Sequence, residues 1–286
     1  MTEASATERC LNCGAPLSGP FCSSCGQRAI PANPTVAELT NDAWRELSGY
    51  DGRILATVRG LLQPGQLTDE YLAGRRAHYL PPLRVYLTVS VLYFLTAAAA
   101  PPTIGEINGR QVSAGGIRVE VTSTNAAGVL SDEDRAQLKE TLADTPAILR
   151  PMLQSVIEDP AAFRARIFST MPRVLFAMLP VFAAIVALFY RGRNYPTALV
   201  FGAHLHSAVF LVLTVAELAK FSNSVVFAVT ASGVALAGLF VYTLRAFRRV
   251  YGGGWFAVIG KSVAIGIVYG VASAPALFLM LLWVAS

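Results

Sequence analysis

The chain has 286 residues, of which 54% are hydrophobic and 14% are charged. Soluble domains carry about 25% charged residues, so this composition, with a mean hydropathy of +0.50, excludes an ordinary soluble protein and indicates a membrane protein. The net charge of +5 does not indicate nucleic-acid binding, because residues 1–84 contain eight basic and eight acidic residues. We therefore expect no nucleic-acid partner.

The polar segment of residues 1–9 is expected to be a disordered tail. It lacks the apolar core of a secretory signal peptide, so we expect the first membrane span to direct insertion.

All four cysteines follow within residues 10–27, at Cys10, Cys13, Cys22 and Cys25. The spacing C-x2-C-x8-C-x2-C lets two pairs of thiolates surround one ion, and four thiolates satisfy the tetrahedral coordination that zinc prefers. A glycine after each pair permits the tight turn that aims backbone N–H groups at the sulfurs. We predict a zinc ribbon with one structural zinc ion, whose binding supplies the folding free energy of so short a segment.

Two other interpretations of the cysteines remain open at the level of the sequence. Two disulfides would require an oxidising compartment. A redox-active Cys-x-x-Cys motif normally accompanies a βαβ pattern, which the surrounding sequence does not show.

Residues 28–82 are predicted to form cytosolic or interfacial helices. Residues 35–49 show a capping box and apolar side chains at helical spacing, and residues 53–62 form a second short helix that a Pro-Gly pair ends. The stretch before the first span then brings Arg75, Arg76 and Tyr79 together. Basic and aromatic side chains at the entrance of a span are typical interface or headgroup anchors.

Five apolar stretches approach the length of about 20 residues that a bilayer span requires. Arg191 and Arg193 lie between the second and third, whereas the loop after the third offers only Lys220; Arg173 and Lys261 do not fit the pattern cleanly. Because basic residues accumulate in cytoplasmic loops, we predict a protein of the cytoplasmic membrane with the N-terminus in the cytosol and the C-terminus outside it. The predicted spans are residues 83–100, 173–190, 197–218, 224–244 and 262–285.

Residues 101–172 are predicted to form a small extracytoplasmic α+β lobe. Asn108-Gly109 is a hairpin signal, and residues 117–122 alternate apolar and polar side chains as a half-buried strand does. Asp159 and Pro160 are expected to open a helix that continues into the second span. No catalytic constellation is recognisable in this segment.

His204 and His206 lie in the third predicted span, and Glu217 follows eleven residues after His206. Ionisable residues inside a membrane are costly, so the three form a candidate intramembrane polar site. At about 100° per residue the two histidines point about 200° apart, which argues against one shared metal ion. The simpler interpretation is that each histidine hydrogen-bonds a neighbouring helix and fixes packing.

Several short motifs occur together along the chain. They are the Cys-x-x-Cys-Gly pairs, Pro64-Gly65, Glu70-Tyr71, Gly74-Arg75-Arg76 with Tyr79 and Pro82, and Val200-Phe201 followed by His204-x-His206. Together they resemble a family of bacterial membrane proteins, the domain of unknown function 3667, whose members often carry Lys-Arg where this chain has Arg75-Arg76. The resemblance supports the same architecture and implies no activity.

The sequence thus predicts a mainly α fold, a polytopic bundle of about five transmembrane helices with a small four-cysteine zinc ribbon and a small α+β lobe. No nucleophile, Walker or Rossmann signature is present. This favours a non-enzymatic protein whose ribbon recruits or senses a cytosolic protein partner while the helices anchor it in the lipid bilayer. The alternative is a small transporter, or an intramembrane metal- or proton-dependent enzyme, that uses the histidines. The sequence does not specify an oligomeric state.

Overall fold

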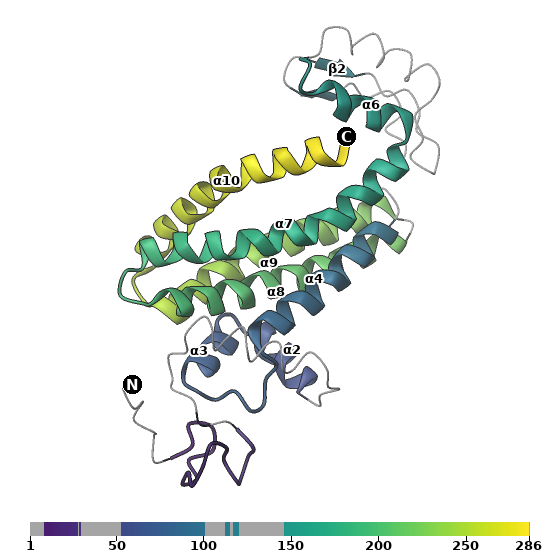
Figure 1. The fold of residues 1–286 in the computed structure, drawn as a ribbon. Helices are drawn as coiled ribbons and strands as arrows, with labels where there is room; N and C mark the ends of the chain where they lie inside the picture. Colours follow the sequence, from purple (N-terminus) through teal and green to yellow (C-terminus); the bar gives the residue numbers. More distant parts are fainter. Residues whose placement is uncertain are drawn as a thin grey trace. The chain divides into compact units, whose positions relative to one another are not determined.

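The computed structural model describes residues 9–27, 29, 53–100, 112–114, 117–119, 146–222 and 224–285. This part of the chain is mainly helical, as predicted, and Figure 1 traces its elements in chain order. Residues 1–8 of the predicted tail (residues 1–9), the helix predicted at residues 35–49 and the Asn108-Gly109 hairpin signal lie outside the described residues.

Two short helices precede the first long one, α2 (Ile54–Leu62) and α3 (Gln66–Leu72). The first matches the helix predicted at residues 53–62, and it ends before the Pro-Gly pair as expected. Together with residues of the long helices, the two helices build an apolar core cluster. Its buried members are Leu61, Leu67, Leu80, Val85 and Ala208.

Among the described residues, five helices are long and apolar enough to cross a membrane, which agrees with the predicted number and indicates a multi-pass membrane protein. Three exceed the predicted spans most clearly, because α7 begins earlier, α9 ends later and α10 begins earlier. The limits of the spans within these helices stay predictions. The helices are α4 (Pro82–Ala99), α7 (Pro160–Phe189), α8 (Tyr195–Leu218), α9 (Val225–Tyr251) and α10 (Trp255–Ala285).

Polar residues begin three of these helices. The Asp159 carboxylate accepts the Ala162 N–H at 2.8 Å at the start of α7, as the sequence leads one to expect. The Asn194 side chain accepts the Thr197 N–H at 3.2 Å before α8, and the Ser224 hydroxyl accepts the Phe227 N–H at 3.3 Å before α9. Such caps satisfy N–H groups that the first helical turn leaves without a partner.

The predicted α+β lobe at residues 101–172 is not supported. Within this segment, the described residues form two antiparallel strands of three residues each, β1 (Val112–Ala114) and β2 (Ile117–Val119). Helix α6 (Arg150–Glu158) and the start of α7 follow them. An isolated two-stranded hairpin has little stability of its own in water. The alternation at residues 117–119 therefore predicted a strand correctly but not a folded domain.

The chain forms two compact units. Unit 1 comprises residues 1–91, 177–212 and 236–270, and unit 2 comprises residues 92–176, 213–235 and 271–286. Each long helix contributes one segment to each unit. Most of the arginines that lie near the ends of the long helices belong to unit 1.

Unit 2 contains two arginines that bind the C-terminal carbonyl groups of helices. Arg164 Nη2 donates to the carbonyls of Ala97 (3.0 Å) and Ala100 (2.7 Å) at the end of α4. Arg166 Nη1 lies 3.3 Å from the carbonyl of Val284 near the end of α10. The last carbonyls of a helix lack partners within the helix, and the helix dipole favours a cation there. The two arginines thus stabilise helix ends.

Replacing Arg164 with glutamine is expected to destabilise the protein by about 2 kcal/mol, because two hydrogen bonds from a charged donor are lost. Thermal unfolding in detergent should show a lower midpoint. Arg166→Gln should have a smaller effect because its single contact is longer, and Arg191→Gln, at an exposed loop position, is the control. Equal midpoints for the Arg164 and Arg191 variants would contradict this role.

Candidate functional site

The four cysteines predicted as metal ligands lie together. The Sγ atoms of Cys10 and Cys25 are 3.6 Å apart, as are those of Cys13 and Cys22, and all four sulfurs lie within 4.8 Å of one another. They are free thiols, since a disulfide requires about 2.05 Å between sulfurs. Among the described residues, no other group of three or more His, Cys, Asp or Glu side chains is close enough to hold a metal ion.

The two Cys-x-x-Cys pairs fold into the same turn. In each, the N–H of the closing glycine donates to the carbonyl of the first cysteine at 2.8 Å, and that cysteine's N–H donates to the carbonyl after the glycine, also at 2.8 Å. Gly14 and Gly26 have φ values of 75° and 71°, which side chains disfavour. The backbone N–H groups of Cys25 and then Ser24 lower the pKa of the Cys22 thiol to about 7. This favours the thiolate of Cys22, the form that binds metals, whereas burial and the neighbouring thiols raise the pKa of Cys13 to about 12.

Gln27 joins the cysteine segment to the loop after α3, which we call the docking loop (residues 74–78). Its Nε2 donates to the Gly74 carbonyl at 2.5 Å, and its Oε1 accepts the N–H groups of Arg76 (2.8 Å) and Ala77 (2.9 Å). Gln27 is only 7% exposed, so these bonds are shielded from water. Its own carbonyl accepts the Cys22 N–H, and the turn around the cysteines therefore fixes the residue that holds the loop.

The docking loop meets the cysteine segment at two further places. A Cβ atom at Gly74 would lie 2.5 Å from Leu11 Cδ1 and 2.7 Å from Leu11 Cβ, and Gly74 has φ 83°. Both features disfavour any side chain at this position. Asn12 Nδ2 lies 3.4 Å from His78 Nε2. Glycine in the family motif is thus the residue that lets the two segments touch.

Arg75, predicted as a headgroup anchor, pairs within the protein. Its Nε and Nη2 donate to the two carboxylate oxygens of Glu70 at 2.5 and 2.8 Å, a bidentate arrangement that fixes the guanidinium plane. This hydrogen bond is the main reason why the pKa of Glu70 is lowered. The Arg75 side chain remains 43% exposed, and its role as an anchor stays a prediction.

Arg76 and Tyr79, the other two predicted anchors, lie against the protein. Arg76 is 8% exposed, its Nε donates to the Tyr71 carbonyl at 3.0 Å, and its guanidinium lies 4.4 Å from the centre of the Tyr71 ring. Tyr79 packs against the core cluster, and burial raises the pKa of its hydroxyl. Their part in headgroup binding also stays a prediction.

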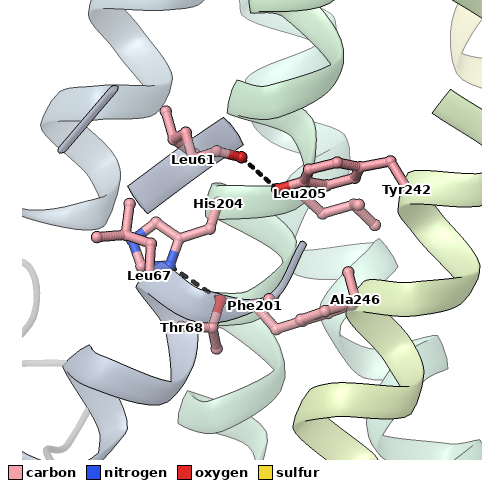
Figure 2. A pocket seen from close by; sticks show the side chains of 9 residues that line it. Leu61, Leu67, Thr68, Phe201, His204, Leu205, Tyr242 and Ala246 are labelled. Atoms are coloured by element: carbon pink, nitrogen blue, oxygen red, sulfur yellow. Dashed lines mark hydrogen bonds between the residues drawn. The ribbon is translucent and has the colours of Figure 1, made fainter. Parts of the chain in front are cut away.

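His204 connects α8 to α3. Figure 2 shows Thr68 of α3 and His204 of α8 turned toward one another, with Thr68 Oγ1 and His204 Nδ1 3.0 Å apart. The Tyr71 ring meets the imidazole edge to face, with the ring centres 6.0 Å apart. His204 is 3% exposed. This contact agrees with the packing interpretation of the histidine.

A small cavity lies beside His204, and the Tyr242 hydroxyl donates to the Leu61 carbonyl at 2.7 Å at its edge. Its lining is apolar except for His204, Thr68 and Tyr242. The Nε2 atom of His204 is buried and finds no hydrogen-bond partner among the described residues. The lining residues are Leu61, Gly65, Leu67, Thr68, Phe201, His204, Leu205, Tyr242 and Ala246.

His206 has different neighbours from His204. Its Nδ1 donates to the Gly202 carbonyl at 2.8 Å, so this nitrogen carries a hydrogen. Three aromatic rings from other helices surround the imidazole, with centre-to-centre distances of 4.8 Å to Phe182, 6.0 Å to Tyr269 and 6.4 Å to Tyr86. The two histidines contact different helices, as their spacing suggests.

Glu217, the third residue of the candidate polar site, belongs to unit 2, whereas both histidines belong to unit 1. Its carboxylate accepts a hydrogen bond from Lys220 Nζ at 2.9 Å. The described contacts thus give His204, His206 and Glu217 three different hydrogen-bond partners. Their joint use in transport or catalysis stays a prediction.

Gln27 and Thr68 are functional-site residues that the sequence analysis missed. A glutamine after a cysteine pair and a threonine in a short helix are ordinary polar residues, and their partners lie far along the chain. The sequence did offer a signal for Tyr71, since the pairs Glu70-Tyr71 and Arg75-Arg76 belong to one motif and lie five residues apart. That spacing matches the observed pairs of Glu70 with Arg75 and Tyr71 with Arg76.

Replacing Gln27 with alanine is expected to release the docking loop without removing the cysteine ligands. Three hydrogen bonds, each contributing about 1 kcal/mol, would be lost, so hydrogen exchange at the Arg76 and Ala77 amides should become at least about tenfold faster. The Gln27→Glu variant keeps the acceptor oxygens but loses the donor to Gly74. Its exchange rates should lie between those of the parent protein and those of the Gln27→Ala variant. Gln63→Ala, at an exposed position, is the control, and unchanged exchange in the Gln27→Ala variant would refute the docking role.

Comparison with known proteins gives one match. Residues 51–94, which include α2, α3, the docking loop and most of α4, match the model of a family described as "Protein of unknown function (DUF3667)". No curated protein and no solved structure matches the chain. The resemblance to this family that the sequence indicates is thereby confirmed for residues 51–94.

Proposed function

We propose that this protein is a multi-pass protein of the bacterial cytoplasmic membrane whose zinc ribbon is held at the cytosolic face to recruit or sense a protein partner. The observation that carries the proposal is the attachment of the cysteine segment to the docking loop through the buried Gln27 side chain. A small head that is fixed in this way presents one defined surface. It has no need of catalytic groups, and its role is binding.

Zinc is the metal that suits the four cysteines best. Zinc–sulfur bonds of about 2.3 Å in a tetrahedron place the sulfurs about 3.8 Å apart, which fits the observed 3.6 Å pairs and the 4.8 Å limit. Four thiolates leave no coordination position open, so the ion would be structural. Its chemistry is to hold the two turns together, and its binding contributes folding free energy.

The exposed side of the ribbon supports a protein partner. Phe21 is 58% exposed, and Pro20, Ser23 and Ser24 around it are exposed as well. Aromatic side chains are frequent anchors of protein interfaces, and small neighbours allow a partner to approach closely. Phe21 is therefore the expected centre of the binding surface.

The distribution of basic residues supports a cytosolic position for the ribbon. Unit 1 contains the ribbon and also the helix ends that carry most of the arginines near the spans. Lys261, which did not fit the pattern, lies near the start of α10 because that helix begins at Trp255; its Nζ lies 4.4 Å from the centre of the Tyr190 ring in unit 1. In unit 2, Arg164 and Arg166 bind helix carbonyls. Free thiols also suit a reducing compartment.

Elemental analysis of the detergent-purified protein is expected to find one zinc ion per chain. A variant with Cys22→Ser and Cys25→Ser should lose it, because two of four ligands are gone. A variant with His204→Ala and His206→Ala should keep it, because the histidines do not touch the cysteine segment. A second metal ion that disappears only with the histidines, or a turnover activity that survives the cysteine variant, would instead favour transport or catalysis.

Recruitment is tested by photo-crosslinking in cells. A benzophenone side chain in place of Phe21 should give a discrete protein adduct, because the partner is expected to cover this residue. The same side chain in place of Arg191, another exposed position of unit 1, is the control. Adding Cys22→Ser and Cys25→Ser should abolish the adduct at position 21. An adduct that forms equally at both positions, or that persists without the metal ligands, would contradict recruitment by the ribbon.

A further inference from the structure

Helix α2 has an inner face that is fixed to the protein. Thr57, Gly60 and Leu61 are buried. The Thr57 hydroxyl accepts the Leu80 N–H at 2.9 Å, and the Leu61 carbonyl accepts the Tyr242 hydroxyl at 2.7 Å. The orientation of α2 about its own axis is therefore set by contacts inside unit 1.

The outer face of α2 is apolar and exposed. Ile54, Leu55 and Leu62 are 48%, 58% and 61% exposed, and Val58 between them is half-buried. At about 100° per residue, these four positions fall within one sector of about 100°. A helix that packs one apolar face on the protein and leaves a second one outward needs another apolar medium, because water is unfavourable for it.

The contact with Tyr242 sets the level of α2 along the membrane-spanning helix α9. Tyr242 lies three residues before Arg245, or about 4.5 Å along the helix axis, and Arg248 and Arg249 follow. Clustered arginines at the end of a span mark the headgroup region. Leu61, bonded to Tyr242, therefore lies close to the boundary between headgroups and acyl chains, where amphipathic helices insert about 5–10 Å deep.

The charge of α2 fits an anionic lipid surface. The helix sequence ILATVRGLL contains no acidic residue, and its one arginine, Arg59, is exposed. Arg59 lies about 40° beyond the outermost residue of the apolar sector. An arginine at the edge of an embedded face can reach lipid phosphates while its stem stays near apolar surface.

We infer that α2 is an in-plane interfacial helix that inserts Ile54, Leu55 and Leu62 into an anionic phospholipid bilayer, with Arg59 on the headgroup phosphates. This inference goes beyond the proposed role of the ribbon and does not depend on it. A lipid-embedded α2 would hold the docking loop, and with it the ribbon, at the membrane surface.

The test uses the full-length protein in vesicles whose lipids carry bromine on the acyl chains. A dansyl-bearing side chain is incorporated at position 55, 62 or 63 in separate samples. Bromine quenches a dansyl group only within the acyl region, so emission at positions 55 and 62 should fall by about twofold or more. Gln63, exposed and one residue beyond Leu62, is the matched control and should be quenched much less. Thermal unfolding midpoints equal to that of the parent show that each labelled protein is folded.

Each outcome decides the inference. Strong quenching at positions 55 and 62 but not at 63 supports it, whereas equal quenching at all three positions, strong or weak, overturns it. A blue-shifted emission without quenching, dependent on the protein-to-lipid ratio, means that a second copy covers the face, and this also overturns it. Quenching at position 55 should be stronger in phosphatidylglycerol than in phosphatidylcholine vesicles, and Arg59→Gln should remove that difference. If the difference persists in this variant, Arg59 does not bind the phosphates.

Discussion

The buried side-chain amide of Gln27 makes three of the hydrogen bonds that join the cysteine segment to the docking loop. Gln27 satisfies one carbonyl and two N–H groups of the docking loop at once, and buried polar groups that lose their partners are costly. The three bonds are therefore expected to form together or not at all. The Gln27 backbone is itself held by the turn around Cys22. We therefore expect the folding of the cysteine segment to be coupled to the ordering of the docking loop.

These contacts explain why the motif of Glu70-Tyr71 and Gly74-Arg75-Arg76 has its spacing. Glu70 and Tyr71, at the end of α3, each hold one of the two arginines that follow Gly74, and the glycine makes room for Leu11. One helical turn earlier, Thr68 bonds to His204 of α8. A continuous set of contacts thus runs from the cysteines through the loop and α3 to a histidine in a membrane-spanning helix.

The sequence was informative where the signal is local. Cysteine spacing predicted the cluster at Cys10 to Cys25, and apolar length predicted five long helices, because both depend on residues close together in the chain. It was uninformative for Gln27 and for Thr68 with His204, whose partners are 47 or more residues away. The prediction of an α+β lobe was wrong for another reason. Alternation at residues 117–119 reports a strand, but two short strands do not imply a domain. The fifth span was predicted to begin at residue 262, whereas α10 begins at Trp255, so Lys261 lies within the helix.

The contact of Arg164 with the end of α4 has a consequence for how this protein can change in evolution. Since Arg164, near the start of α7, bonds to the carbonyls of Ala97 and Ala100 at the end of α4, the two ends of the chain segment that connects these helices are held together, as the ends of a closed loop are. The entropy of such a loop grows only slowly with its length, so doubling it costs about 0.6 kcal/mol. A change in the length of this connection therefore costs little free energy of loop closure, and the helices on either side of it can stay in register.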